Sequence, residues 1–292
     1  MNRIKGILYA AVSSSTFGLA PFFSITLLLA GCSAFEVLSY RWGVASIVLI
    51  VFGWLSGCNF RLAGKDWGVV FLLSLLRAVT SFSLIIAYQN IASGVASTIH
   101  FMYPLAVALA MMFFFREKKS LLVILAVLMS LLGAALLSLG ELEAKSGNTM
   151  VGLVAACVSV FSYAGYIVGV RTTRAVQINS TALTCYVMGL GTIFYLIGAY
   201  CTSGLQLVSD GYTWLIILGL ALPATAISNI TLVQAIKYAG PTLTSILGAM
   251  EPLTAVVIGV FVFKELFTVN SAVGIILILL AVSIVVFRRQ KS

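Results

Sequence analysis

The sequence predicts an all-α integral membrane protein with ten transmembrane helices, arranged as two inverted five-helix repeats. Of its 292 residues, 61% are hydrophobic and only 9% are charged, and the mean hydropathy is +1.14. Soluble domains do not have such a composition. The chain also holds about ten apolar runs of ~20 residues, each long enough to cross a bilayer. The third observation is that its two halves resemble each other.

Apolar runs separated by polar residues define the expected helices. In order along the chain, these are 6–29, 34–56, 67–89, 92–115, 120–140, 150–170, 180–202, 211–235, 242–263 and 270–287. The connections between them are short and leave no room for a separate globular domain. The whole chain is therefore expected to lie in the lipid bilayer as one membrane domain.

The duplication is clearest around two prolines. Tyr103-Pro104 and Glu251-Pro252 each precede an apolar run, and 13 positions separate the proline from an acidic residue, Glu117 or Glu265. The starts of the halves also match, Gly6, Ala10, Ser13, Thr16 and Phe17 corresponding to Gly152, Ala156, Ser159, Ser162 and Tyr163. We expect repeats over 1–144 and 145–292. Because five crossings is an odd number, the second repeat should enter the membrane from the opposite side.

Lys and Arg residues are enriched in cytoplasmic loops of membrane proteins, so their distribution predicts orientation. With a cytoplasmic N-terminus, thirteen fall on the inner side, namely Arg3, Lys5, Arg61, Lys65, Arg116, Lys118, Lys119, Arg171, Arg174, Lys237, Arg288, Arg289 and Lys291. Only Lys145 and Lys264 fall outside. This predicts a bacterial inner-membrane protein with both termini in the cytoplasm. The net charge of +9 is then a topology signal, and no long basic tract suggests nucleic-acid binding.

Several function classes lack their usual residues. The chain has a single histidine, five scattered cysteines without a Cys-x-x-Cys pair, and no glycine-rich phosphate loop. We therefore expect neither an enzyme nor a metal or other cofactor, and no ATP-driven pump.

The Pro104-to-Glu117 and Pro252-to-Glu265 segments, with Glu251 directly before the second proline, resemble the ten-helix EamA type of the drug/metabolite transporter superfamily. The resemblance covers essentially the whole chain. It implies two inverted five-helix repeats and the export or exchange of metabolites such as amino acids. The first repeat has Tyr103 where the family often has Glu, so only Glu251 inherits the role of an acidic residue at this position.

Ionisable residues inside the membrane are costly, at about 2.5–3.5 kcal/mol each, and usually face a cavity or a partner. The candidates are Arg41, Arg77, His100 and Glu251. Arg77 is expected near the midplane, on one helix face with Ser74, Ser81 and Tyr88. Its guanidinium has the geometry to grip a substrate carboxylate through two parallel hydrogen bonds. The alternative is a structural ion pair or a side chain that reaches the interface.

Each proline removes a hydrogen bond to the carbonyl four residues earlier. Pro252 should leave the Gly248 carbonyl as an open acceptor beside Glu251, and together these groups could hold a substrate ammonium or a proton. The alternative for Glu251 is a bond to a neighbouring hydroxyl or to Arg77 that only holds helices together. Pro104 should likewise free the His100 carbonyl, and His100 is either a proton-binding residue or a packed, hydrogen-bonded one.

The remaining candidates shape the walls and hinges of a cavity. Arg41 is expected near the outer end of its helix, where its long stem reaches the interface, with a structural or gating role. Tyr163 and Tyr166, near Ser159 and Ser162, could form a cation–π wall or simply pack between helices. Asn229, with Thr225 and Ser228, is the polar segment after Pro223, and interhelical hydrogen bonding is its alternative role. Rocking is expected at the helices that contain Pro21, Pro104, Pro223 and Pro252.

Together these features predict a secondary transporter, an exporter of small polar solutes such as amino acids, which works by alternating access. In this hypothesis the small-molecule substrate places its carboxylate on Arg77, and Glu251 meets its ammonium or a proton. Two other hypotheses stay open. An exchanger of anionic or phosphorylated metabolites would need Arg41 to reach inward, and a membrane scaffold or sensor would bury its polar residues without a cavity. The sequence predicts no particular oligomeric state.

Overall fold

The computed structural model describes residues 2–91, 93–117, 121–138, 147–202, 204, 208–261 and 268–288, and these residues contain helices and loops without strands. The helices are α1 (Asn2–Phe17), α2 (Ala20–Leu29), α3 (Ala34–Leu55), α4 (Trp67–Asn90), α5 (Ser93–His100), α6 (Tyr103–Phe113), α7 (Leu121–Ser138), α8 (Thr149–Thr172), α9 (Ser180–Cys201), α10 (Gly211–Ala221), α11 (Ser228–Ala239), α12 (Pro241–Leu247), α13 (Met250–Phe261) and α14 (Val269–Arg288). Short 3-10 turns cover Gly64–Asp66 and Arg174–Gln177, and a π-helix covers Leu222–Ile227.

Each expected apolar run is present as one helix or as a helix interrupted once, with ends within a few residues of the predicted ones. Seven segments among the described residues are long and apolar enough to cross a membrane, and the runs Leu121–Gly133 and Ala272–Ile284 are shorter apolar helices. These findings confirm the all-helical membrane class. The count of ten crossings stays a prediction, and the predicted repeat boundary between 144 and 145 lies outside the described residues.

Polar residues at the ends of the apolar runs stop and start the helices. Ser33 and Glu36 form a reciprocal capping box before α3, in which the Glu36 carboxylate accepts the Ser33 backbone N–H at 2.7 Å. Asn179 and Asp210 cap α9 and α10 with their side-chain oxygens. Gly240 ends α11 with φ of 85°, a conformation that favours glycine, and Pro241 then starts α12. Each device satisfies backbone groups that the helix itself leaves unpaired.

Four interruptions fall at prolines inside the apolar runs. α1 gives way to α2 just before Pro21, α5 to α6 just before Pro104, and α12 to α13 just before Pro252. Around Pro223 the chain instead widens into the π-helix between α10 and α11. Since proline cannot donate to the carbonyl four residues back, a regular α-helix cannot continue through these positions. The prolines predicted as hinges therefore coincide with breaks in helical geometry, and rocking at these positions stays a prediction.

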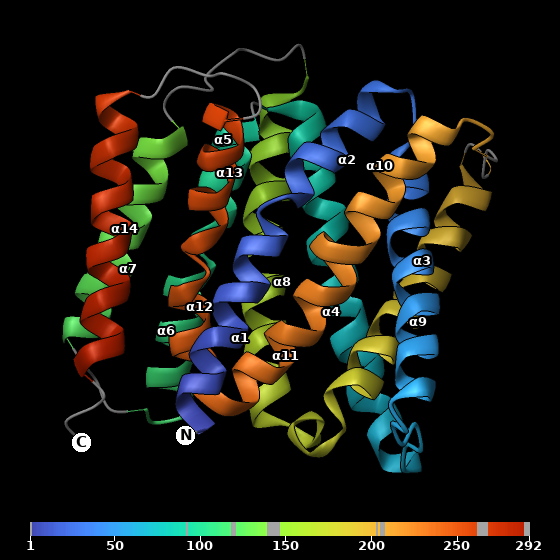
Figure 1. The fold of residues 1–292 in the computed structure, drawn as a ribbon, viewed down its shortest axis with the longest axis horizontal. Coiled ribbons are helices and arrows are strands. Elements are labelled where there is room, and N and C mark those ends of the chain that lie inside the picture. Colours follow the sequence, from blue (N-terminus) through green and yellow to red (C-terminus); the bar gives the residue numbers. More distant parts are fainter. Residues whose placement is uncertain are drawn as a thin grey trace.

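Each helix of one half packs against a helix of the other half. α3 lies against α9 and α7 against α14, at the two sides of the bundle in Figure 1. Between them, α1 packs along α11, α8 packs along α4, and α6 contacts α12. When the apolar segments of each repeat are numbered one to five, the second, fourth and fifth segments each pack against their counterparts in the other repeat. The first segment of each repeat packs against the third segment of the other. Related halves that pack about a two-fold axis produce this pattern.

The ends of these pairs show that α1 and α8 run in opposite directions. A Cβ on Gly6, at the start of α1, would lie 2.7 Å from the Ala239 backbone at the end of α11. Arg171, at the end of α8, donates to the Lys237 carbonyl near that same end of α11 at 3.0 Å. Conversely, a Cβ on Gly152, near the start of α8, would lie 2.6 Å from the Ile91 side chain after α4. The matching glycines therefore allow close helix contacts at opposite ends of the bundle.

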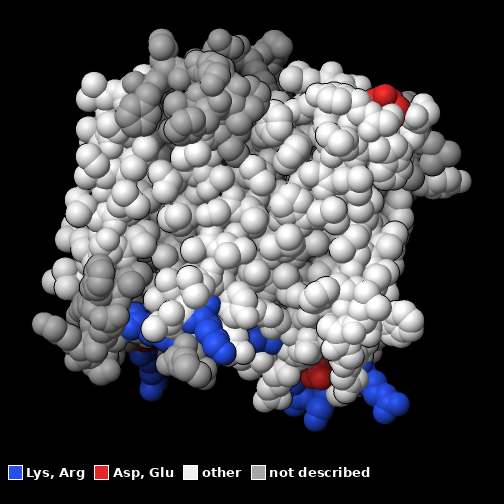
Figure 2. All heavy atoms as spheres, viewed as in Figure 1, with Lys and Arg blue, Asp and Glu red and all other residues white. Residues whose placement is uncertain are grey.

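The surface of the bundle is apolar along its length and basic at one end (Figure 2). Large hydrophobic side chains such as Ile47, Phe71 and Leu280 are exposed, whereas the interior contains many buried polar side chains. The Lys and Arg side chains visible in Figure 2 gather at the lower end, where α1 begins in Figure 1. Lys118, Lys119, Lys145, Lys264, Arg289 and Lys291 lie outside the described residues. An apolar outer surface around a polar interior is what a bilayer requires.

Candidate functional site

Arg77 lies near the middle of α4 at the centre of the bundle, and only 1% of it is exposed. Its Nε donates a hydrogen bond to Asn229 Oδ1 of α11 at 3.0 Å, and Asn229 Nδ2 in turn donates to the Thr225 carbonyl at 2.7 Å. The bond joins the first half of the chain to the second. Arg77 therefore occupies the interior position predicted for it, and Asn229 makes the interhelical contact that was one of its two expected roles.

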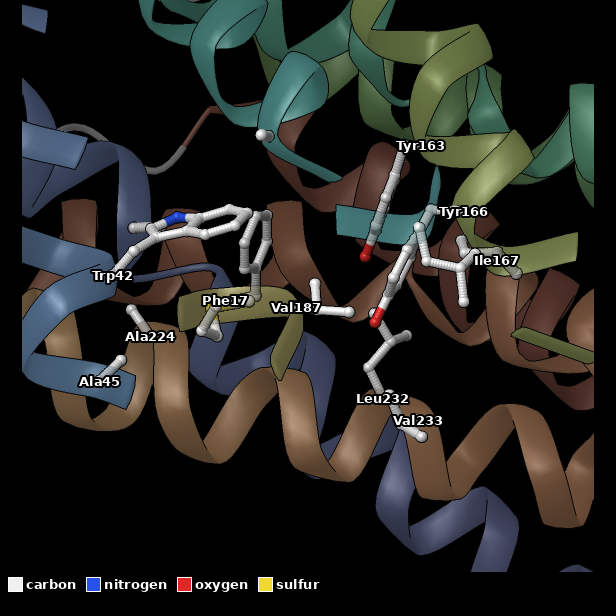
Figure 3. Close-up of a cluster of buried hydrophobic side chains, with 14 of the residues drawn as sticks. Phe17, Trp42, Ala45, Tyr163, Tyr166, Ile167, Val187, Ala224, Leu232 and Val233 are labelled. Carbon is white, nitrogen blue, oxygen red and sulfur yellow. The ribbon is translucent and has the colours of Figure 1, made fainter. Parts of the chain in front are cut away.

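Aromatic rings surround the Arg77 guanidinium. Its central carbon lies 4.8 Å from the Tyr163 ring centre, 5.3 Å from Phe17 and 5.9 Å from Tyr166. The two tyrosine rings are nearly parallel, with an interplanar angle of 7°, and their hydroxyl groups point in the same direction in Figure 3. The expected cation–π wall therefore exists, and the cation it holds is the protein's own Arg77. The Tyr166 hydroxyl is buried without a hydrogen-bond partner among the described residues.

Arg41 of α3 also lies in the interior, with 5% of it exposed. Its Nε donates to Thr225 Oγ1 at 2.6 Å, and its guanidinium carbon lies 5.5 Å from the Phe17 ring centre. The expectation that its stem carries the charge to the membrane interface is wrong. Arg41 instead reaches inward, as the anion-exchange hypothesis required. Sequence spacing could not decide this, because Arg41 and Arg77 come from different helices and are brought together by Phe17 and the segment after Pro223.

His100 ends α5 and is buried. Its Nδ1 lies 2.8 Å from the Ser159 hydroxyl of α8, and its ring stacks on Tyr163 at a centroid distance of 5.4 Å. Its Nε2 has no partner among the described residues. His100 is thus the packed, hydrogen-bonded histidine that the sequence allowed as one alternative, with one nitrogen still free.

Tyr103 and Glu251, which occupy matching positions in the two repeats, meet each other at the centre of the protein. The Tyr103 hydroxyl donates a long hydrogen bond of 3.4 Å to Glu251 Oε1. Two carboxylates at this meeting point would repel each other or share a proton, whereas a tyrosine supplies a donor. The departure from the family pattern at position 103 is therefore compatible with a single acidic residue here.

Gly248 makes this meeting possible. A Cβ at position 248 would lie 1.8 Å from the Tyr103 hydroxyl oxygen, so any side chain there would occupy the space of that group. The predicted open acceptor at Gly248 is wrong, because the Glu251 backbone N–H donates to the Gly248 carbonyl at 2.8 Å. Glu251 is half-buried and faces a cavity rather than forming an ion pair with Arg77.

Two adjoining cavities lie in the interior; residues of both halves line the larger one, and the residues that line the smaller one all belong to the first half. The larger, of about 50 Å³, is lined by Glu251, Pro252, His100 and Ser97 among others. The smaller, of about 20 Å³, is lined by Arg41, Arg77, Ser81 and Thr80 among others. Phe17, Pro21, Leu84 and Tyr88 line both. Because one water needs roughly 10–15 Å³ of such space, the cavities have room for a few waters only.

The predicted residues thus fall into three groups. Arg77, Ser81, Tyr88, His100 and Glu251 line a cavity, as do Pro21 and Pro252 of the hinges. Tyr163, Tyr166 and Asn229 line neither cavity but contact Arg77 or His100, which do. Pro104 lies at the helix break next to the site, and Pro223 lies in the π-helix beside Thr225.

Several residues that line or hold the site were missed as site residues, among them Phe17 and Tyr103 and the cavity-lining Thr80, Leu84 and Ser97. Phe17 contacts both guanidinium groups, and Tyr103 binds Glu251. The signal was present in the repeats, since Phe17 matches Tyr163 and Tyr103 matches Glu251. Residues at matching positions of the two repeats therefore meet at the same site. A candidate residue in one repeat predicts that its counterpart in the other repeat also belongs to the site.

An all-helical, apolar-surfaced bundle, duplicated internally and polar at its centre, defines the class of multi-pass membrane transport proteins. The chain belongs to the EamA-like transporter family, whose sequence pattern matches residues 4–139 and again 150–287. The two matches coincide with the duplication read from the sequence, and membership confirms the resemblance to the drug/metabolite transporter superfamily.

Two further similarities agree with this. A protein of Archaeoglobus fulgidus (strain ATCC 49558 / DSM 4304 / JCM 9628 / NBRC 100126 / VC-16), described as an uncharacterized transporter, is 28% identical over 238 residues, which are 80% of this chain and 83% of that protein. A protein of known crystal structure matches with a TM-score of 0.80 over 100% of this chain and 99% of that one, at 18% identity. The latter similarity concerns the fold alone.

Proposed function

We propose that this transporter is a secondary exporter of small polar organic solutes, such as amino acids, in the cytoplasmic membrane of a bacterium. The observation that carries the proposal is the pair of adjoining interior cavities, of which the smaller is lined by Arg41 and Arg77 and the larger by Glu251 of the second half. A zwitterion needs both charges, held a short distance apart. Charged groups are costly inside a membrane, and their presence beside a cavity is typical of a substrate path.

Each lining residue has a role in this mechanism. Arg77 binds the substrate carboxylate through the guanidinium nitrogens that Asn229 does not occupy. Glu251 binds the ammonium group or a proton. Ser81, Tyr88 and His100 provide polar walls, while Tyr163 and Tyr166 hold the Arg77 guanidinium in place.

Alternating access is supported by the helix breaks and by the cavity size. The cavities are too small for an amino acid, so the halves must move apart before a solute enters. Breaks at Pro21, Pro104 and Pro252 surround the larger cavity, and the π-helix at Pro223 holds Thr225 beside the smaller one. The opposed courses of α1 and α8 support an inverted repeat, in which one half rocks against the other to expose the site on alternate sides.

Orientation follows from charge. The end of the bundle that carries the visible Lys and Arg side chains would face the cytoplasm, with both chain termini there.

Counterflow of labelled amino acids in proteoliposomes tests the proposal. The double variant Arg77→Ala, Glu251→Ala should lose flux, whereas Arg61→Ala, Asp66→Asn should transport normally because it changes the same two charge types outside the cavities. Both proteins must show the same yield and the same gel-filtration profile. Undiminished flux in the cavity variant removes both residues from the mechanism.

Proton coupling has its own test. If Glu251 carries the proton, an imposed pH gradient should drive uptake into proteoliposomes, and Glu251→Gln should abolish that response while still permitting counterflow. A response that persists in Glu251→Gln assigns the proton to another group.

The burial of Arg41 beside Arg77 favours a second candidate, the exchange of anionic metabolites. Counterflow of organic anions in the same proteoliposomes separates this candidate from export of zwitterions. A scaffold or sensor, in contrast, would show no flux with any solute.

A further inference from the structure

Arg41 and Arg77 are held in the same way. Each uses its Nε to donate to the segment that follows Pro223, Arg41 to Thr225 at 2.6 Å and Arg77 to Asn229 at 3.0 Å. This fixes the base of each guanidinium and leaves its two terminal nitrogens for other partners. Terminal nitrogens in this arrangement match the two oxygens of a carboxylate.

The two guanidinium groups share one neighbourhood. Their central carbons lie 5.5 Å and 5.3 Å from the ring centre of the same residue, Phe17, and both side chains line the smaller cavity. Arg41 Nη2 is buried and has no hydrogen-bond partner among the described residues. A buried donor on a charged group is unfavourable unless a partner satisfies it, and a bound ligand can be that partner.

The charges of this region do not balance. Of the described residues that line the two cavities, Arg41 and Arg77 are cationic and Glu251 alone is acidic. With Glu251 ionised, one positive charge is left over, and with Glu251 protonated, two are left over. A zwitterionic solute has no net charge and neutralises neither excess. A solute with one negative net charge neutralises the excess that remains when Glu251 is ionised, and one with two neutralises the excess that remains when Glu251 is protonated.

We propose that Arg41 and Arg77 together form one anion-binding subsite, and that the solute carried by this protein is an acidic amino acid or a similarly charged small dicarboxylate. This inference rests on the proposed transport through these cavities. One carboxylate of the solute binds the terminal nitrogens of Arg77 and the other binds those of Arg41. The ammonium group, where the solute has one, lies toward Glu251 in the adjoining cavity.

Arg41 then decides between acidic and neutral solutes. Glutamate and glutamine have nearly the same shape and differ by one charged group, so they report on this subsite directly. Loss of hydrogen bonds to a charged group corresponds to roughly a ten- to hundredfold loss of binding. The wild-type protein should therefore prefer glutamate to glutamine by at least about tenfold.

The experiment measures counterflow of labelled glutamate and glutamine, and of aspartate and asparagine, in proteoliposomes. Arg41→Gln should reduce transport of the acidic member of each pair by roughly ten- to hundredfold and leave the amide member equal or better. Arg41→Lys, which keeps the charge, should retain the preference at lower affinity. Arg61→Gln removes an exposed arginine outside the cavities and serves as the matched control.

A second measurement covers the case in which no amino acid is transported. Glutarate and glutaramide are added to the purified protein in detergent, and thermal unfolding is recorded. Glutarate should raise the unfolding temperature of the wild-type protein and of Arg61→Gln, but not of Arg41→Gln. Arg61→Gln removes an exposed arginine that lines neither cavity.

The outcomes separate the two proposals. Transport of glutamate and aspartate by Arg41→Gln at the wild-type rate overturns the subsite and leaves the transport proposal standing. Stabilisation by glutarate that depends on Arg41, without any transport, supports the subsite and overturns the transport proposal. Neither transport nor stabilisation overturns both.

Discussion

The hydrogen bond between Arg77 and Asn229 is expected to be a stronger link between the two halves than a neutral hydrogen bond would be. It is buried, it joins α4 to α11, and its donor is charged. A hydrogen bond to a charged group contributes about 1.5–3 kcal/mol. Neutral hydrogen bonds between helices in membranes average only about 0.6 kcal/mol. The two values are far enough apart to be distinguished by experiment.

A double-mutant cycle isolates the pair from other changes. Arg77→Met removes the charge and its aromatic contacts, Asn229→Ala removes the acceptor, and the double variant removes both. The coupling energy of the cycle should be about 1.5–3 kcal/mol, since leaving either partner alone strands a buried polar group.

A neutral pair in the same protein supplies the control. Thr80 of α4 donates to Ser162 of α8 at 2.9 Å, and both residues are buried. The cycle of Thr80→Val and Ser162→Ala should give a coupling near 0.6 kcal/mol. Unfolding by SDS in detergent micelles, followed by fluorescence of the 4 tryptophans, measures both cycles. A coupling for Arg77 and Asn229 no larger than that of the control would refute the reasoning.

Two further predictions concern the helix crossing and a loop. Gly248→Ala should lower stability by about 1–3 kcal/mol because its Cβ collides with the Tyr103 hydroxyl. Gly189→Ala should not lower stability, because a Cβ at this position meets open space. Tyr103→Phe should restore part of the stability that Gly248→Ala loses. Equal unfolding temperatures of the two glycine variants would contradict this steric argument. Backbone and side-chain hydrogen bonds from Thr213 lower the pKa of Asp210 below its ordinary value. The cap on α10 is therefore complete above about pH 4 and is lost as the pH falls through the lowered pKa. Hydrogen exchange at the start of α10 should speed up on acidification, and Asp210→Asn should remove that dependence; exchange that stays pH-independent in the wild type, after correction for intrinsic rates, would oppose it.

The hydrophobic pattern was sufficient for the helices, because a segment that crosses lipid must satisfy its own backbone hydrogen bonds. The predicted runs 34–56 and 180–202 correspond to α3 and α9 almost to the residue. Prolines in the apolar runs also predicted where helices break, since the missing N–H acts locally.

The site was only partly predictable. Arg77, Glu251, Tyr88 and Ser81 could be recognised because charge and polarity inside a membrane are costly wherever they occur, and each lines a cavity. The inward position of Arg41 could not be predicted from the sequence, because its long side chain can take several directions. Only the packing of α3 against α10 and the π-helix selects the inward direction.

The sequence by itself determined that this protein is a duplicated helical membrane protein with ionisable residues in its apolar segments. Composition, run length and proline position act over a few residues or over the whole chain, and both can be read directly. Only the tertiary structure decided that Tyr103 meets Glu251, and that two arginines meet on one phenylalanine. The contact of Tyr103 with Glu251, and the hydrogen bonds that hold Arg41 on Thr225 and Arg77 on Asn229, join residues more than a hundred positions apart and depend on how the two halves cross.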